Sequence, residues 1–305
     1  MSLSYTTRRN LFGNLCNNSS ASTLSLADTL MNIAEKRIIY SRDWDFLWRQ
    51  YTKTTVATEQ SIKLPAYTHK PQSVYVTVGS YRYTPIEVTN RRDWDKLNST
   101  TTNSDICTHY FVYDGSIELF PIPVTSGNTV TFNARRKAKD LTIADTSGSA
   151  VITTIATSGV VTTVTQSDSD WGTGMIGQYI KIAPTNAAKG GDGQWYEIAS
   201  VPTASTLTLV KTYGGTAIAT ATADYTIGQL SLIPEPHDSL PVFEALKMYY
   251  ASVDPDVKKS ELYAKMFIEG YDQMVRDHGS KMNVVVDDGT GQYDTYDNPN
   301  LSVTL

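Results

Sequence analysis

The amino-acid sequence predicts an α+β fold: a small helical bundle with a β-rich excursion, an inserted all-β sandwich or barrel domain, and an extended C-terminal arm. Three observations predict it. Residues 238–281 carry apolar stripes at helical spacing. Residues 53–140 alternate apolar and polar side chains, as strands do. Residues 141–228 are poor in charge and rich in Thr, Ser, Ala and Gly, with turns at short intervals. The expected segments are residues 1–52 (arm and first helix), 53–140 (β-rich region), 141–228 (inserted domain), 229–281 (helix pair completing the bundle) and 282–305 (arm).

Two helices with a sharp stop between them are expected in residues 238–281. Asp238 and Ser239 are natural caps for the first, and Pro241 suits its first turn, where a missing N–H costs little. At the stop, Asp254 can cap the second helix and Pro255 suits its first position. The apolar stripes comprise Val242, Phe243, Leu246, Tyr249, Tyr250 and Val253, then Tyr263, Met266, Phe267, Gly270, Tyr271 and Met274.

The helix pair needs a partner, and the sequence offers one far upstream. Residues 1–22 are polar and are expected to form a loosely ordered arm. From Thr23 onward, Leu26, Leu30 and Ile33 recur at helical spacing. We therefore expect three separated amphipathic segments to pack together as a bundle.

Turn residues organise the β-rich region. Gly79-Ser80 and Asp114-Gly115 predict hairpins, and Trp94 is expected to be buried in a short helix or turn. A basic run closes the region with Arg135, Arg136, Lys137 and Lys139. These side chains are candidates for contact with a neighbouring subunit or with a DNA backbone, and a solvated loop is the alternative.

The inserted segment leaves and rejoins the same neighbouring region, near Leu141 and Leu230, which is the arrangement that makes an insertion tolerable. Its aromatic residues Trp171, Trp195 and Tyr196 have two interpretations. They are either core residues of a β-domain or contacts for a glycan, a tail protein or a fibre.

Residues 282–305 carry four aspartates and no Lys or Arg. Alone, this segment should be extended and mobile. Val284–Val286 and Leu301–Leu305 are each suited to adding a strand to another subunit or docking on one.

Composition excludes several protein classes. The 305 residues carry a formal net charge of −5 with a pI of about 5.4, which argues against binding driven by phosphate neutralisation. No apolar run is long enough for a membrane span, and the N-terminus lacks the pattern of a signal peptide. The two cysteines, Cys16 and Cys107, make a disulfide framework improbable.

No catalytic motif stands out, and no catalytic residue, metal ligand or cofactor is assigned. The sequence lacks the common zinc, phosphate-loop and dinucleotide motifs. Cys107 and His109 lie on one face of a probable strand, but a buried thiol beside a surface histidine is the simpler interpretation. A carboxylate pair for glycoside hydrolysis has no fixed spacing, so a virion-associated cell-wall glycosidase remains the enzymatic alternative.

The order of segments resembles the head-to-tail adaptors of tailed bacteriophages, also called connector, head-completion or tail accessory proteins, most closely those of short-tailed phages. The resemblance covers roughly residues 25–280 and is carried by the strand-turn DGSIELFPIP, by VYVTVGSYRYTPIEV and by the closing helix with PVFEALKMYYAS.

The resemblance implies a structural virion protein, made in the host bacterial cytoplasm and placed at the capsid vertex. It implies a ring of about twelve subunits, a dodecamer, between the portal protein and the tail tube, nozzle or fibres. Genomic double-stranded DNA would pass through the lumen without sequence recognition, and no membrane would be involved. The arm residues expected to dock on the portal are Val284, Val285, Val286, Tyr293, Tyr296, Leu301, Val303 and Leu305. A glycan-binding or fibre-binding module is the remaining alternative.

Overall fold

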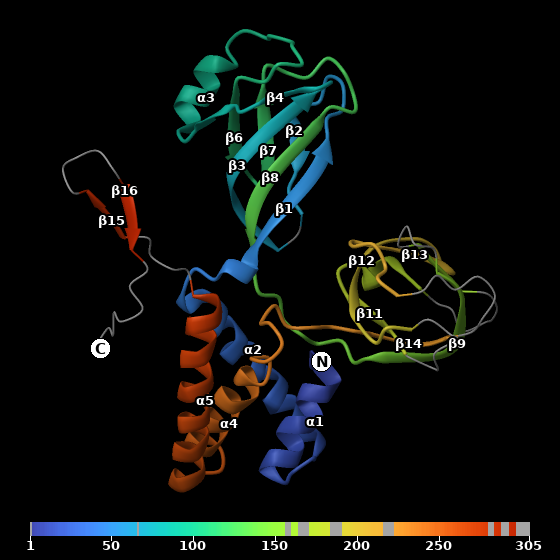
Figure 1. The fold of residues 1–305 in the computed structure, drawn as a ribbon, viewed down its shortest axis with the longest axis vertical. Helices are drawn as coiled ribbons and strands as arrows, with labels where there is room; N and C mark the ends of the chain where they lie inside the picture. The colour runs from blue at the N-terminus through green and yellow to red at the C-terminus, as the bar shows by residue number, and fades with distance from the viewer. Residues whose placement is uncertain are drawn as a thin grey trace. The chain divides into compact units, whose positions relative to one another are not determined.

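The computed structural model describes residues 2–65, 67–155, 160–163, 171–183, 191–215, 223–279, 284–287 and 293–296. Contacts within the chain divide it into two compact units (Figure 1). The first holds residues 1–40 and 138–273, and the second holds residues 41–137 and 274–305. Helices and largely antiparallel sheets are both present, so the predicted α+β class is confirmed.

The described residues of the first unit contain the helices α1 (Tyr5–Cys16), α2 (Ala21–Ser41), α4 (Leu240–Ser252) and most of α5 (Val257–His278). The existence of α1 shows that a loosely ordered arm was the wrong prediction for residues 5–16. Ser4 begins this helix because its Oγ accepts the Thr7 N–H at 3.3 Å, and Asn17 ends it with a left-handed φ of 53°. Because α1 buries Arg8 as well as Phe12, its buried face does not appear as an apolar stripe.

Helix α4 contacts the other helices of this unit. The ring of Phe12 in α1 meets that of Tyr249 edge-on, with centroids 5.7 Å apart. Tyr250 stacks on Tyr263 of α5 at 5.9 Å. Side chains from α1, α2, α4 and α5 form one apolar cluster, so the three predicted amphipathic segments do pack together. Its buried members are Phe12, Ala27, Met31, Val242, Ala245, Leu246, Tyr249, Tyr250 and Tyr263.

The two C-terminal helices are confirmed, and Ser239 is the N-cap residue of the first, but the capping hydrogen bonds differ from those expected. Ser239 makes no capping hydrogen bond with its side chain, and the carboxylate of Asp238 accepts the Leu3 N–H at 2.6 Å instead. Between the helices, Asp256 rather than Asp254 is the capping residue, since its Oδ1 accepts the Lys259 N–H at 3.1 Å. The second helix therefore begins two residues after Pro255.

The rest of the first unit is a closed β-barrel (Figure 1). Its strands follow the order β10-β13-β12-β11-β14-β9, all antiparallel. Their bounds are β9 Thr146–Ile155, β10 Val160–Thr163, β11 Tyr179–Ile182, β12 Trp195–Thr203, β13 Thr206–Leu209 and β14 Ala223–Gly228, with a 3-10 turn at Thr173–Met175. The described side chains inside it are Trp171, Ile180, Ile182, Ile198, Leu207, Leu209, Tyr213, Tyr225 and Ile227.

The second unit contains two four-stranded sheets. One has the order β1-β8-β3-β4, with β1 Trp48–Thr54, β3 Thr68–Val78, β4 Tyr81–Tyr83 and β8 Thr129–Arg136. The other has the order β2-β7-β6-β5, with β2 Ser61–Lys63, β5 Ile86–Val88, β6 His109–Tyr113 and β7 Ser116–Phe120. A 3-10 turn at Asp45–Leu47 precedes β1.

The two sheets share one apolar core, to which Val74, Val130 and Phe132 contribute from the first sheet and Ile117 and Leu119 from the second. The predicted hairpins are confirmed: Val78 pairs with Tyr81 and Tyr113 with Ser116. Helix α3 (Arg91–Leu97) buries Trp94, as expected, and the indole stacks on Phe111 at 5.6 Å.

The described part of the C-terminal segment is a two-stranded sheet. Strand β15 (Val284–Asp287) pairs antiparallel with β16 (Tyr293–Tyr296), and Val284 lies opposite Tyr296. Two described segments of the expected arm thus pair with each other within the chain. Leu301, Val303 and Leu305 lie outside the described residues.

Candidate assembly surfaces

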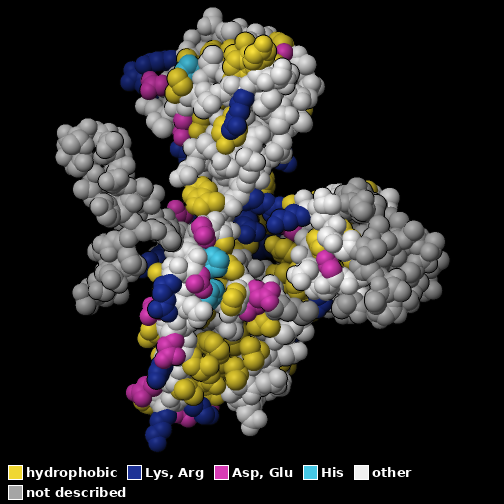
Figure 2. Space-filling model, viewed as in Figure 1, with side chains coloured by type: hydrophobic (Ala, Val, Ile, Leu, Met, Phe, Trp, Pro, Cys, Tyr) yellow, Lys and Arg dark blue, Asp and Glu magenta, His cyan; other side chains and the backbone are white. Residues whose placement is uncertain are grey.

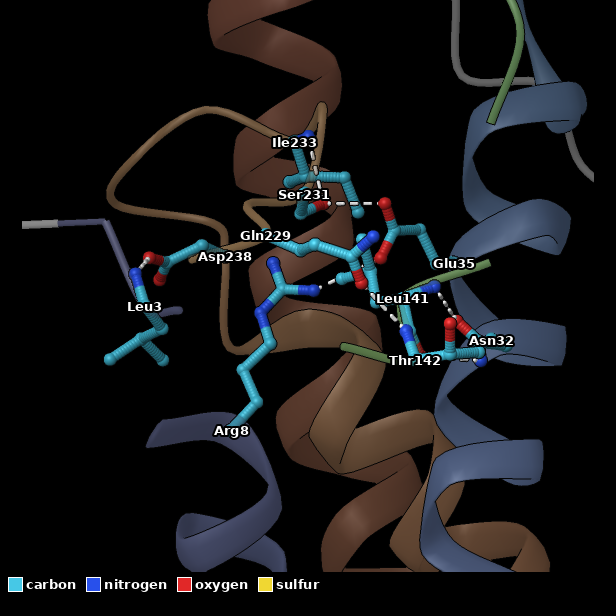
Figure 3. A network of polar contacts seen from close by, with 10 residues as sticks. All are labelled: Leu3, Arg8, Asn32, Glu35, Leu141, Thr142, Gln229, Ser231, Ile233 and Asp238. Carbon is cyan, nitrogen blue, oxygen red and sulfur yellow. Dashed lines mark hydrogen bonds and ion pairs between the residues drawn. The ribbon is translucent and has the colours of Figure 1, made fainter. Parts of the chain in front are cut away.

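The two chain segments that lead into and out of the barrel are hydrogen-bonded to each other and to α2 (Figure 3). Asn32 of α2 donates through Nδ2 to the Leu141 carbonyl at 3.1 Å and accepts the Leu141 N–H at 2.9 Å. The Oε1 atom of Gln229 accepts the N–H groups of Thr142 and Ile143 at 2.7 and 2.9 Å. The two side-chain amides thereby give hydrogen-bond partners to backbone groups of residues 141–143, which lie outside the strands.

The N-terminal residues bind the same two segments. Ser4 forms a bridge with Leu230, and the Tyr5 N–H donates to the Gln229 carbonyl at 2.9 Å. Asp145, on the incoming segment, accepts a hydrogen bond from the Ser4 hydroxyl and donates its own N–H to Thr6 Oγ1. The start of α1 therefore holds both ends of the barrel insertion.

A buried ion pair lies beside these contacts. Arg8 Nη1 is 3.0 Å from Glu35 Oε2, and both side chains are almost fully buried. Glu35 Oε1 also accepts the Ser231 hydroxyl at 2.9 Å (Figure 3). Such a pair adds little net stability over apolar packing, but removing one member leaves an uncompensated buried charge. It thereby fixes α1, α2 and the outgoing segment in one arrangement.

Three of the four residues of the basic run are engaged within the chain. Arg135 donates to the Arg42 carbonyl at 2.6 Å, and Arg136 donates to the Phe46 carbonyl at 3.0 Å. Lys139 donates to the Gly177 carbonyl at 3.3 Å, and burial lowers its pKa. Lys137 has an exposed side chain. The run therefore divides into three side chains with internal contacts and one directed to solvent.

The three barrel aromatics differ in exposure. Trp171 is 4 % exposed, and its Nε1 donates to the Tyr225 hydroxyl at 3.1 Å inside the barrel. Trp195 is partly exposed, and Lys181 Nζ lies 5.0 Å from the centre of its ring. Tyr196, also partly exposed, donates to Asp192 and accepts the Gly214 N–H at 2.9 Å. Trp195 and Tyr196 are thus the members of this set that reach the surface.

Helix α5 carries exposed apolar side chains on two of its sides, which sequence reasoning missed. Within it only Tyr263 and Met274 are buried. Leu262 and Ile268 are 54 % and 57 % exposed, and Met266 lies one turn from Leu262. Figure 2 shows side chains of both charges along this helix and hydrophobic side chains gathered over α4. The signal in the sequence was Leu262 and Ile268, apolar residues that lie off the buried stripe.

Comparison with known proteins identifies the kind of protein that carries these surfaces. The model of the SU10 adaptor protein family matches residues 6–156. The match supports a phage head-to-tail adaptor. The matched range holds all of α1 but its first residue, then α2, both sheets of the second unit and β9. A comparison with curated proteins found no match. An adaptor family implies a structural component of the virion and association with phage portal and tail proteins.

The Cys107 thiol is poorly suited to act as a nucleophile. Cys107 is buried, and burial raises its pKa to about 11. The neighbouring His109 contacts the Thr108 hydroxyl through Nδ1 at 2.9 Å. At neutral pH the buried thiol stays protonated, and the thiolate is the reactive form.

In the described parts of the chain, no three His, Cys, Asp or Glu residues gather closely enough to hold a metal ion. No helix there is both long and apolar enough to cross a membrane.

Proposed function

We propose that the adaptor forms a ring of about twelve subunits between the portal and the tail of a short-tailed phage. The ring would seal the capsid vertex and let the genomic DNA pass through its lumen without reading its sequence. The observation that carries the proposal is the match of residues 6–156 to the SU10 adaptor protein family. A net charge of −5 supports a lumen that repels DNA rather than binding it.

The exposed surface of α5 supports a contact between copies in such a ring. Repeated head-to-tail contact requires each copy to present two complementary surfaces. Leu262 and Met266, one turn apart, supply apolar area, and exposed apolar groups framed by polar ones are typical of interaction sites. Charges of both signs, including the Lys265–Glu269 pair at 3.8 Å, suit a contact between identical chains.

The C-terminal segment is our candidate for attachment to the portal. The residues proposed to dock are Val284, Val285, Val286, Tyr293, Tyr296, Leu301, Val303 and Leu305. Ordering a segment on binding costs free energy. Many segments acting on one portal ring share a high effective concentration, which offsets that cost.

The contacts of the barrel and of the basic run are proposed from the exposure of their side chains. Trp195 and Tyr196 are the barrel aromatics available to a tail or fibre protein, whereas Trp171 serves the barrel core. Lys137 is the member of the basic run directed to solvent, so it is the first candidate for contact with a neighbouring subunit or with DNA.

Virions assembled without the protein test the proposed function. We expect filled heads that lose their DNA and fail to bind tails. Heads that keep their DNA and carry tails in its absence would contradict the proposal.

A further inference from the structure

A small pocket lies between α1, α2 and the segment that leads into the barrel. Its volume is about 10 Å³, and Tyr5, Arg8, Asp28, Met31, Asn32, Glu35 and Leu141 line it. The residues from α2 follow one face of that helix, at positions i, i+3, i+4 and i+7. The pocket therefore adjoins both the buried ion pair and the Asn32–Leu141 contact.

Arg8 brings two buried N–H donors to this pocket. Its Nη1 binds Glu35, while Nε and Nη2 are both buried and make no hydrogen bond to any described residue. The side chain is 2 % exposed, so bulk water does not reach these atoms. A guanidinium is planar, and its Nε–H and one Nη2–H point the same way as a fork. Buried donors of this kind nearly always have a partner.

A residue with a buried hydrogen-bond acceptor, Asp28, lines the same pocket. Asp28 Oδ1 is buried and makes no hydrogen bond to the described residues, while Oδ2 lies 3.3 Å from Arg9 Nε. Burial raises the pKa of Asp28 above its usual value, while a side-chain hydrogen bond with Tyr5 and the charge of Arg9 lower it. Arg8 of α1 and Asp28 of α2 thus line one small space.

The size of the space decides what it can hold. About 10 Å³ corresponds to a single water-sized probe, which excludes a carboxylate or a phosphate. One basic side chain, Arg8, and two acidic ones, Asp28 and Glu35, line the pocket, and Arg9 pairs with Asp28, so charges of both signs lie around it.

We propose that the pocket binds one ordered water molecule that bridges Arg8 and Asp28. The water accepts from Arg8 Nε–H and Nη2–H and donates to Asp28 Oδ1. Three hydrogen bonds are typical of a buried water. Together with the Arg8–Glu35 pair, the water joins α1 to α2 beside the position where Asn32 holds Leu141.

A crystal structure of the full chain at a resolution that shows ordered water tests the proposal. We expect one density peak in the pocket, roughly 2.7–3.2 Å from both Arg8 nitrogens and within hydrogen-bond distance of Asp28 Oδ1. An empty pocket, an Arg8 fork bound directly to Asp28, or a peak with the anomalous signal of chloride would each overturn it.

A matched pair of variants separates this water from ordinary surface hydration. Arg8→Met removes both donors and should abolish the peak. Arg9→Met removes only the outer partner of Asp28 and should leave the peak in place. Retention of the peak in Arg8→Met would contradict the proposal. Should Arg8→Met fail to fold, the wild-type crystal together with Arg9→Met still decides the question.

Discussion

Asn32 and Leu141 exchange two hydrogen bonds, one through each end of the asparagine amide. The amide acts on the connecting segment as a neighbouring β-strand would, although it projects from a helix. The two residues are separated by 109 positions, so this contact ties the N-terminal helices to the start of the barrel insertion.

Replacing Asn32 with Ala should destabilise the first unit. The change leaves the N–H and C=O of Leu141 without these partners, and we expect the free energy of unfolding to fall by about 2 kcal/mol. Urea unfolding measures this value. Asn14→Ala, at an exposed position of α1, is the matched control and should change it by less than about 0.5 kcal/mol. If the two substitutions lowered the free energy of unfolding equally, the Asn32 contact would contribute no more to stability than an exposed asparagine does.

The basic run should separate into structural and exposed members. Arg136→Met removes the hydrogen bond to the Phe46 carbonyl and should lower the free energy of unfolding by about 1–2 kcal/mol. Lys137→Met should change it by less than about 0.5 kcal/mol while altering the salt dependence of assembly. Urea unfolding and sedimentation at two salt concentrations provide the readouts. A stability loss confined to Lys137→Met would reverse this assignment.

Stability should fall in alkali because buried tyrosines keep their protons in the folded state. Burial, followed by the nearby Glu87 carboxylate, raises the pKa of Tyr110 from 10.0 to about 12. Between these two values the unfolded chain loses a proton that the folded chain retains. The free energy of unfolding therefore falls by about 1.4 kcal/mol per pH unit for each such tyrosine. Burial likewise raises the pKa of Tyr5 and Tyr213 to about 12.

Tyr110→Phe should make this alkaline slope shallower by about 1.4 kcal/mol per pH unit. Unfolding curves across the same pH range give the slope. Tyr81→Phe, at a side chain that is 71 % exposed, is the matched control. A slope unchanged by Tyr110→Phe would mean that this hydroxyl ionises equally in both states.

Deleting residues 283–305 should spare the fold and weaken attachment to the portal. The described strands of this segment pair with each other, so we expect little change in the unfolding temperature. Removing only residues 297–305 separates the contribution of the last residues from that of the hairpin. Affinity for the portal, measured by surface-immobilised binding, should drop in at least the longer deletion. Equal affinity of both truncated proteins and the full chain would argue against the proposed docking role.

Local patterns in the sequence predicted the elements but not the contacts between distant residues. Helices α4 and α5 and the turns at Gly79 and Asp114 were readable because their signals lie within a few residues. The predicted apolar stripes were wrong at Val253 and Met266, which are 48 % and 37 % exposed. Helix α1 was missed because one of its buried side chains, Arg8, is charged. Its burial depends on Glu35, which lies 27 positions away.

The candidate surfaces also depend on contacts between residues far apart in the sequence. The basic run was readable as a cluster of charge, but its carbonyl partners near residues 42–46 come from a separate stretch of chain. The exposure of Leu262 and Ile268 depends on which side of α5 meets α4, which a single-sequence pattern shows only in part.

Negative-stain images of the purified chain mixed with its portal test the central claim most directly. We expect a ring of adaptor copies on each portal. The ring should be lost in the double variant Leu262→Lys, Met266→Lys and kept in Ile86→Lys, which alters an exposed apolar side chain of β5. Bare portals beside a monomeric chain, with correctly folded wild-type protein, would contradict the claim that this protein is a ring-forming adaptor.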